Sequence, residues 1–278
     1  METTLHKPSV KVSVQTLASG AAVEVERRGA VGWIKLNRPD QINAINDDIR
    51  HGVPAALAEL DADSSVRVIV ICGAGSRGFC AGADIKEQRA AESSIQVRRR
   101  MQKARWIEAL DRTEKPVIAA IHGYCMGGGL ELALACDLRF AAPGAVFSLP
   151  ETGLGLIPGG GGTQRLGAVV GPGRALDLLL TGDRLDARQA IDIGLVTRVA
   201  GSAESLIDEV AALAERIAAK PPTATLFVKQ AARAATQLDL KSGLDLELDL
   251  FAMLVPMRDV KEAAIAFREK RAPSFTGE

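Results

Sequence analysis

A single glutamate interrupts a segment that is otherwise apolar. Glu131 lies within LELALAC, residues 130–136, where its neighbours are leucine, alanine and cysteine. A helix that is apolar nearly all round is buried, and burying an unpaired carboxylate costs several kcal/mol. Glu131 is therefore either half of a salt bridge, with Arg139 or Arg165 as a partner, or an acid/base group tuned for proton transfer.

A second glutamate, Glu151, is followed closely by the glycines of residues 159–162, and Glu131 follows the glycines of residues 127–129. Glycines at the start of a helix either allow close packing or leave backbone N–H groups free to bind an oxyanion. Proton transfer beside a carbonyl requires a base, an acid and such N–H donors. We therefore predict that Glu131 and Glu151 form an acid/base pair, although their spacing in the chain does not show that they meet.

Residues 73–78 have the pattern G-x-G-x-x-G directly after a predicted strand. A dinucleotide site would require a helix to begin at this turn, so that the helix N-terminus faces the pyrophosphate. The following residues, FCAGA, continue as a loop instead. We interpret the motif as a turn without NAD.

The composition limits the classes of partner. The 34 Lys and Arg residues balance the 34 Asp and Glu residues, and only 4% of residues are aromatic, so we expect no nucleic-acid partner. The four cysteines form no C-x-x-C pair and the three histidines are scattered, which predicts reduced thiols and no metal site. Without a secretory signal or an apolar run long enough to span a membrane, the chain is expected to be cytoplasmic with no membrane partner.

Strands and helices alternate over most of the chain. VEVERR and VGWIKL predict a hairpin, while residues 66–72 and 116–121 predict buried strands. Asn46 is expected to cap a helix, and a charged helix is expected over residues 92–111. Four helices follow residue 202, so the pattern indicates an α/β fold with parallel strands and a helical tail.

Several segments resemble the crotonase (enoyl-CoA hydratase/isomerase) superfamily. The three most specific are FCAGADIKE, HGYCMGGGLELALACD and LPETGLGLIPGGGGTQRL, and NRPDQINAIN, LTGDRLDARQAIDIGLV and FREKRAPSFTGE extend the similarity over residues 21–278. The resemblance implies an α/β crotonase-like spiral of ββα units in residues 21–201. It further implies a C-terminal helical trimerisation region in residues 202–278, which builds homotrimers or hexamers. Residues 1–20 would be a flexible N-terminal extension.

The resemblance also implies the substrate and the catalytic groups. The substrate would be an acyl-CoA, with no separate cofactor because coenzyme A is part of the substrate. The N–H groups of Ala83 and Gly128 would form the oxyanion hole. One of the two glutamates would activate water for attack on C3, and the pair would manage protonation at C2, while the N–H of Gly159 would position the water.

The same resemblance places the coenzyme A contacts. Ala81, Ile85 and Lys86 would lie along the CoA adenine and phosphates. Phe267 and Lys270 would reach the CoA bound to a neighbouring subunit.

Because both glutamates are present, the resemblance favours an enoyl-CoA hydratase, a hydro-lyase. The alternatives are an enoyl-CoA delta-isomerase or a methylglutaconyl-CoA-type hydratase. Some relatives bind RNA through a lysine-rich helix near the opening loop. The equivalent stretch here, NAINDDIRHGVPAALAELDADSS, is net acidic, which disfavours RNA binding.

Overall fold

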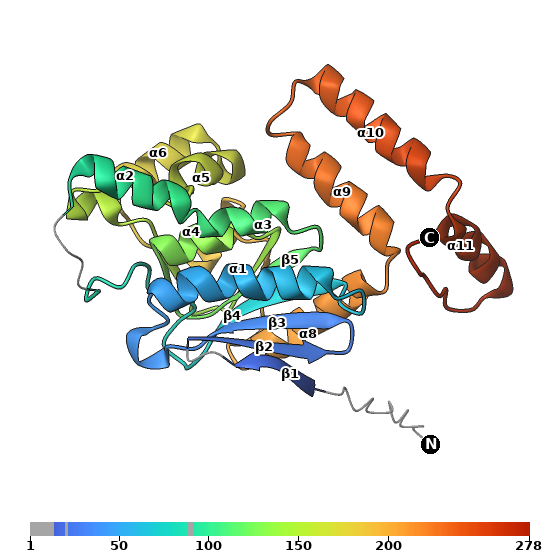
Figure 1. Ribbon diagram of the computed structural model, residues 1–278, viewed down its shortest axis with the longest axis horizontal. Coiled ribbons are helices and arrows are strands. Elements are labelled where there is room, and N and C mark those ends of the chain that lie inside the picture. Colours follow the sequence, from blue (N-terminus) through green and yellow to red (C-terminus); the bar gives the residue numbers. More distant parts are fainter. Residues whose placement is uncertain (1–13, 20–21, 88–91) are drawn as a thin grey trace.

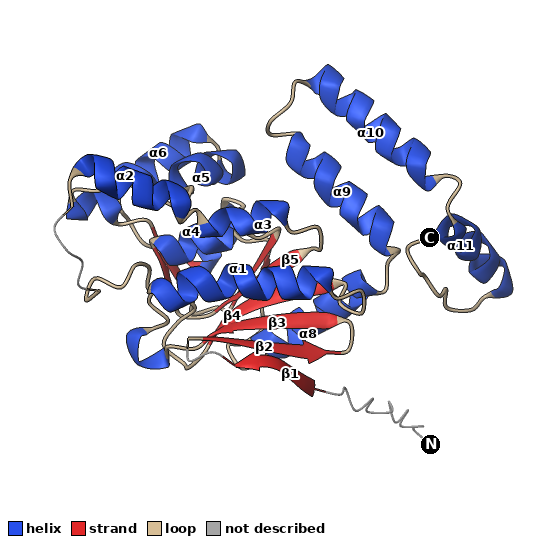
Figure 2. Ribbon diagram, in the orientation of Figure 1, coloured by secondary structure: helices blue, strands red, loops and turns tan. Residues whose placement is uncertain are grey.

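The computed structural model describes residues 14–19, 22–87 and 92–278, and its centre is a mixed sheet (Figures 1 and 2). The spatial order of the seven strands is β1-β2-β3-β4-β5-β7-β10. The first three strands pair antiparallel, and the strands from β3 onward pair parallel. The strands are β1 (Val14–Ser19), β2 (Val23–Arg28), β3 (Val31–Leu36), β4 (Val68–Gly73), β5 (Val117–Ile121), β7 (Leu138–Ala141) and β10 (Arg198–Val199).

A second, three-stranded sheet has the order β6-β8-β9. Its strands are β6 (Tyr124–Met126), β8 (Val146–Ser148) and β9 (Leu185–Asp186). The β6 strand leads directly into the glycine-rich start of the helix that carries Glu131. This sheet therefore fixes where that helix begins.

Eleven α-helices and three short 3₁₀ helices are assigned within the described residues. The α-helices are α1 (Asp47–Ala62), α2 (Ser94–Lys103), α3 (Ala109–Arg112), α4 (Gly128–Ala135), α5 (Gly162–Val170), α6 (Pro172–Thr181), α7 (Ala187–Asp192), α8 (Leu206–Ala218), α9 (Pro222–Ala234), α10 (Leu240–Leu254) and α11 (Arg258–Glu269). The 3₁₀ helices are η1 (Pro39–Gln41), η2 (Trp106–Glu108) and η3 (Glu151–Leu154).

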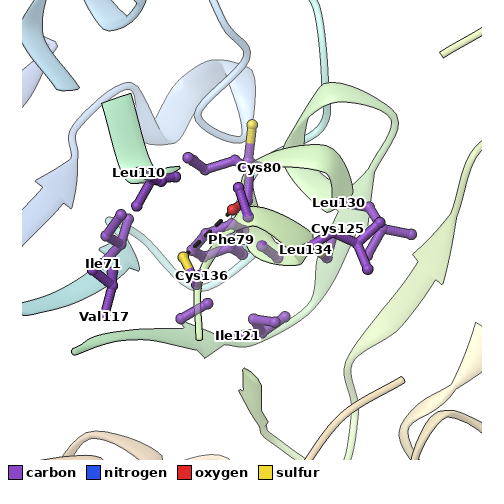
Figure 3. Packing of buried hydrophobic residues seen from close by; sticks show 14 of the residues in the cluster. Ile71, Phe79, Cys80, Leu110, Val117, Ile121, Cys125, Leu130, Leu134 and Cys136 are labelled. Carbon is purple, nitrogen blue, oxygen red and sulfur yellow. Dashed lines mark hydrogen bonds between the residues drawn. The ribbon is translucent and has the colours of Figure 1, made fainter. Parts of the chain in front are cut away.

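Alternate residues of the central strands enter two separate cores, as the two-residue period of a strand requires. On β4, Ile69 and Ile71 face the core that includes α1, whereas Val68 and Val70 face the core that includes α8. The helix α4 belongs to the first core. Its Leu130 and Leu134 lie among Phe79, Cys80 and Cys125, as Figure 3 shows.

The C-terminal helices divide into two kinds. The helix α8 packs against the sheet, whereas α9, α10 and α11 extend away from it (Figure 1). The α10 helix carries an apolar stripe of four strongly exposed side chains: Leu240, Leu244, Leu248 and Phe251. None of the helices in the described part of the chain is both long and apolar enough to cross a membrane.

Two expectations need correction. Val14–Ser19, within the predicted flexible extension, forms β1 and pairs with β2, while residues 1–13 and 20–21 lie outside the described residues. The predicted helix over residues 92–111 is broken after α2 into η2 and α3. The break lets Ile107 and Leu110 enter the core, whereas α2 itself buries no residue.

The predicted cap of α1 is confirmed. The side chain of Asn46 accepts a hydrogen bond from the N–H of Ile49 at 3.1 Å. The helix contains Pro54 and continues through it to Ala62.

Candidate functional site

Glu131 and Glu151 meet at the start of α4. The N–H of Glu131 donates to the carbonyl oxygen of Gly127 at 3.0 Å. A methyl group on Gly127 would lie 2.9 Å from Oε1 of Glu151, so that carboxylate rests against the first turn of the helix. The two glutamates, 20 positions apart in the sequence, thus face one region of the structure.

Glu131 is held by backbone amides. Its side chain is buried, with 4% of the residue exposed, and Oε1 accepts the N–H groups of Gly160 at 2.6 Å and Gly162 at 2.9 Å. A methyl group on either glycine would approach the carboxylate, to 2.9 Å and 3.1 Å respectively. Gly160 and Gly162 therefore donate their N–H groups to the Glu131 carboxylate and, without side chains, leave room for it. The sequence does not reveal that these glycines bind Glu131.

The salt-bridge alternative for Glu131 is wrong for both proposed arginines. Arg139 donates to the carbonyl oxygens of Leu195 at 2.7 Å and Cys136 at 2.9 Å. Arg165 forms a two-pronged ion pair with Asp111, at 2.9 and 2.6 Å.

Glu151 lies in a different environment, on η3. Its Oε2 is buried and has no hydrogen-bond partner among the described residues. Burial raises the pKa of the Glu151 carboxyl, the negative charge of Glu131 raises it further, and a hydrogen bond to its own backbone partly opposes the rise. A carboxyl in this position retains a proton more readily than an exposed glutamate does.

The N–H groups of Ala83 and Gly128 lie close together. A methyl group on Gly82 would be 3.4 Å from the nitrogen of Gly128, and one on Gly128 would be 3.9 Å from the nitrogen of Ala83. We find no acceptor for either N–H within residues 14–19, 22–87 and 92–278. Gly128 is also the first residue of α4, where backbone N–H groups are unpaired and the helix dipole is positive.

The loop that carries Ala83 is aligned by the segment before α1. Ile45 accepts a hydrogen bond from the N–H of Asp84 at 3.0 Å and donates its own N–H to Gly82 at 2.8 Å. The backbone N–H and C=O groups of Ile45 thus bind Gly82 and Asp84, the residues on either side of Ala83. In this pairing the N–H of Ala83 itself points away from Ile45.

The fully buried Asn43 supports this loop, and its role was not predicted. Its side-chain nitrogen donates to the carbonyl oxygens of Ala74 and Gly78, each at 3.0 Å, and its oxygen accepts the N–H of Arg38 at 2.9 Å. Its left-handed backbone, with φ of 54°, is a conformation that asparagine adopts more readily than most residues. The NAIN sequence is the signal that marks this position.

The other predicted contact residues fall into two groups. Ala81, Ile85 and Lys86 lie on the same loop as Ala83, with Ile85 88% exposed, and Gly159 lies next to the Glu131 donors under the side-chain tip of Met101. Phe267 and Lys270 lie on and just after α11, away from α4 in the same chain (Figure 1). The first group therefore lies on the Ala83 loop or beside the Glu131 donors, whereas the second group lies apart from α4.

The cysteines do not form part of this chemistry. All four are buried, and burial raises the pKa of the Cys80 and Cys136 thiols to about 12 each. The described residues contain no group of three or more His, Cys, Asp or Glu side chains placed to hold a metal ion.

Residues 26–278 match the enoyl-CoA hydratase/isomerase family. The chain is 41% identical over 254 residues to the crotonyl-CoA hydratase of Syntrophomonas wolfei, covering 90% of this chain and 96% of that protein. It is 37% identical over 249 residues to the short-chain-enoyl-CoA hydratase of Clostridium acetobutylicum, covering 90% and 95%.

The fold agrees with these matches. The crystal structure of the enoyl-CoA hydratase from Bacillus anthracis superposes with a TM-score of 0.87 and 39% identity, covering 92% of this chain and all of that chain. A Geobacillus kaustophilus enoyl-CoA hydratase structure gives the same TM-score at 42% identity, covering 92% and 98%. The expected α/β crotonase fold is thereby confirmed, and the chain belongs to the enoyl-CoA hydratase/isomerase family.

Proposed function

We propose that the protein is an enoyl-CoA hydratase that adds water across the 2,3-double bond of an acyl-CoA thioester. The observation that carries the proposal is the convergence of Glu131 and Glu151 beside the unpaired N–H groups of Ala83 and Gly128. The crotonyl-CoA and short-chain-enoyl-CoA hydratases among the relatives support the same reaction.

The two amides form the oxyanion hole. When hydroxide adds to C3, negative charge develops on the thioester oxygen as an enolate. The N–H groups of Ala83 and Gly128 donate to this oxygen, and the positive end of the α4 dipole adds to the stabilisation. The donors are fixed before the substrate arrives, so little reorganisation is needed during the reaction.

The two carboxyls differ in their surroundings and so take different roles. Oε1 of Glu131 accepts two N–H bonds, which leaves Oε2 to take a proton from water as its oxygen attacks C3. Glu151, whose pKa is raised, donates the proton that C2 of the enolate receives. The N–H of Gly159 positions the attacking water. The net change in the substrate is addition of OH at C3 and H at C2, and the proton taken up by Glu131 then returns through solvent to Glu151 to complete the cycle.

Coenzyme A extends from the oxyanion hole over the loop containing Ala81, Ile85 and Lys86. We propose a homotrimer or a pair of trimers, because α10 exposes an apolar stripe that a second copy would cover. Phe267, 86% exposed, and Lys270 would then contact the CoA of a neighbouring subunit. The proposed enzyme acts in the cytoplasm and uses no cofactor beyond the CoA of its substrate.

We expect Glu131→Gln and Glu151→Gln each to lower kcat for crotonyl-CoA at least ~100-fold, because each removes a positioned base or acid. Loss of the conjugated thioester absorbance measures hydration, and CoA binding should persist in both variants. Glu215→Gln, an exposed substitution on α8, is the control and should retain full activity. A pure isomerase, the alternative function, would leave the crotonyl-CoA signal unchanged.

Gly128→Pro tests the oxyanion hole. Proline is tolerated at the first position of a helix but has no N–H, so we expect kcat to fall by about 100- to 1,000-fold. Gly128→Ala is the matched control. It keeps the N–H and places a methyl group 2.9 Å from the movable tip of Ile45, so most activity should remain. Equal rates for the two variants would rule out the assigned donor.

Glu151→Gln should also make the folded protein more stable at high pH. Burial raises the pKa of Glu151 in the folded protein above its ordinary value of 4.5. Ionised Glu151 therefore destabilises the fold at pH values above this raised pKa, and the cost disappears below the pKa of the unfolded chain. We expect the variant to have a Tm roughly a few degrees above that of the wild type at pH 8.5, with the difference closing toward pH 5. Circular dichroism melts at both pH values measure this, and a Tm below wild type at pH 8.5 would contradict it.

A further inference from the structure

The C-terminal end of α4 is held by arginine side chains. This helix has two turns and ends at Ala135, and the last carbonyl groups of a helix have no partner within it. Arg139 donates to the carbonyl oxygen of Cys136 at 2.9 Å, and Arg233 donates to that of Ala135 at 3.0 Å. Cations in this position also interact favourably with the negative end of the helix dipole.

Arg233 comes from α9, about a hundred positions further along the chain. Besides Ala135, its guanidinium donates to the carbonyl oxygen of Leu110 at 3.0 Å and pairs with Asp137 at 2.8 Å. One planar side chain therefore joins α9 to the end of α3, the end of α4 and the residue before β7. A guanidinium can make these contacts together because its five N–H donors have a fixed geometry.

A second set of ion pairs continues from Arg233 to α5. Asp111 lies 4.0 Å from Arg233 and is bound by both terminal nitrogens of Arg165, on α5. The α5 helix begins at Gly162, one of the two donors to Glu131. The series Arg165–Asp111–Arg233 thus connects the element that carries Glu131 with the element that holds its carboxylate.

We propose that Arg233 is a positioning residue for the hydration reaction. By fixing the end of α4 against α3, the Arg233 side chain keeps the Glu131 carboxylate within hydrogen-bonding distance of the N–H groups of Gly160 and Gly162. It also keeps the N–H of Gly128 close to that of Ala83. The C-terminal helical region would then contribute to the acid/base site of its own chain. This inference rests on the proposed function.

Arg233→Ala should lower kcat for crotonyl-CoA about 10- to 100-fold while KM changes less than about two-fold, because displacing a catalytic group by about 1 Å has effects of this size. Arg233→Lys keeps the pairing with Asp137, but a single ammonium cannot span Leu110 and Ala135 as the guanidinium does. Its kcat should therefore fall between those of Arg233→Ala and the wild type. Added guanidinium ion should partly restore kcat in Arg233→Ala.

Lys229→Ala is the matched control. Lys229 lies one turn before Arg233, pairs with the other oxygen of Asp137 at 3.0 Å and donates to the carbonyl oxygen of Lys115 at 2.6 Å. The Lys229→Ala substitution removes a comparable contact between α9 and the core and leaves the contacts to the carbonyl groups of α4 intact. We expect Lys229→Ala to lower the Tm as Arg233→Ala does, yet to keep kcat within about three-fold of the wild type.

Hydrogen exchange at the Gly160 and Gly162 amides separates this inference from the proposed function, because it requires no turnover. Arg233→Ala or Arg233→Lys should speed exchange at these two amides, while Lys229→Ala should not. Unchanged exchange together with unchanged kcat in both Arg233 variants would overturn the inference, as would equal losses of kcat in Arg233→Ala and Lys229→Ala. A wild-type protein that fails to hydrate crotonyl-CoA would refute the proposed function, and the exchange result would still test the positioning role.

Discussion

The fold is organised around the carboxylate of Glu131, which is buried in an apolar helix, is bound by backbone amides and has no ion pair among the described residues. Burying Glu131 would be costly if its oxygens lost water and gained no partner. Two N–H groups, from Gly160 and Gly162, supply the missing hydrogen bonds at 2.6 and 2.9 Å. An arginine at the same place would satisfy the charge but would also occupy the space that a water and a substrate need. Backbone N–H donors satisfy the carboxylate and leave that space free, and only glycine lets the Glu131 carboxylate come so close to the backbone.

The helix α4 connects this constraint to the proposed oxyanion hole. It is two turns long, its first residue lies close to the nitrogen of Ala83, and Glu131 lies within its first turn. Any shift of the helix therefore moves the proposed base and one proposed oxyanion donor together. Leu130 and Leu134 pack in the core and stabilise the lateral position of α4 (Figure 3). Arg139 and Arg233 bind carbonyl oxygens at the C-terminal end of the helix. The Glu151 carboxyl differs from that of Glu131, because its buried Oε2 has no hydrogen-bond partner in the described part of the chain.

Much of this arrangement could be predicted from the sequence. Glu131 and Glu151 stand out because a carboxylate in an apolar segment and one beside glycines are each unusual, and β2, β3, β4 and β5 follow from their alternating or β-branched runs. The sequence did not reveal that Glu131 is bound by amides, because a backbone donor has no side-chain signature. The break before Trp106 was missed because local propensity favours one helix, whereas burial of Ile107 and Leu110 requires a change of direction. The contacts of Arg233 join residues far apart in the chain, and no local pattern indicates them.

A crystal structure with butyryl-CoA, the saturated analogue of crotonyl-CoA, would show whether the two amides and the two carboxyls act on the same thioester. We expect the thioester oxygen to lie within about 3.2 Å of the nitrogens of both Ala83 and Gly128. We also expect C2 and C3 of the acyl group to lie between the carboxyls of Glu131 and Glu151. A thioester oxygen bound away from either amide, or an acyl chain that contacts only one of the two glutamates, would show that these groups do not form one active site.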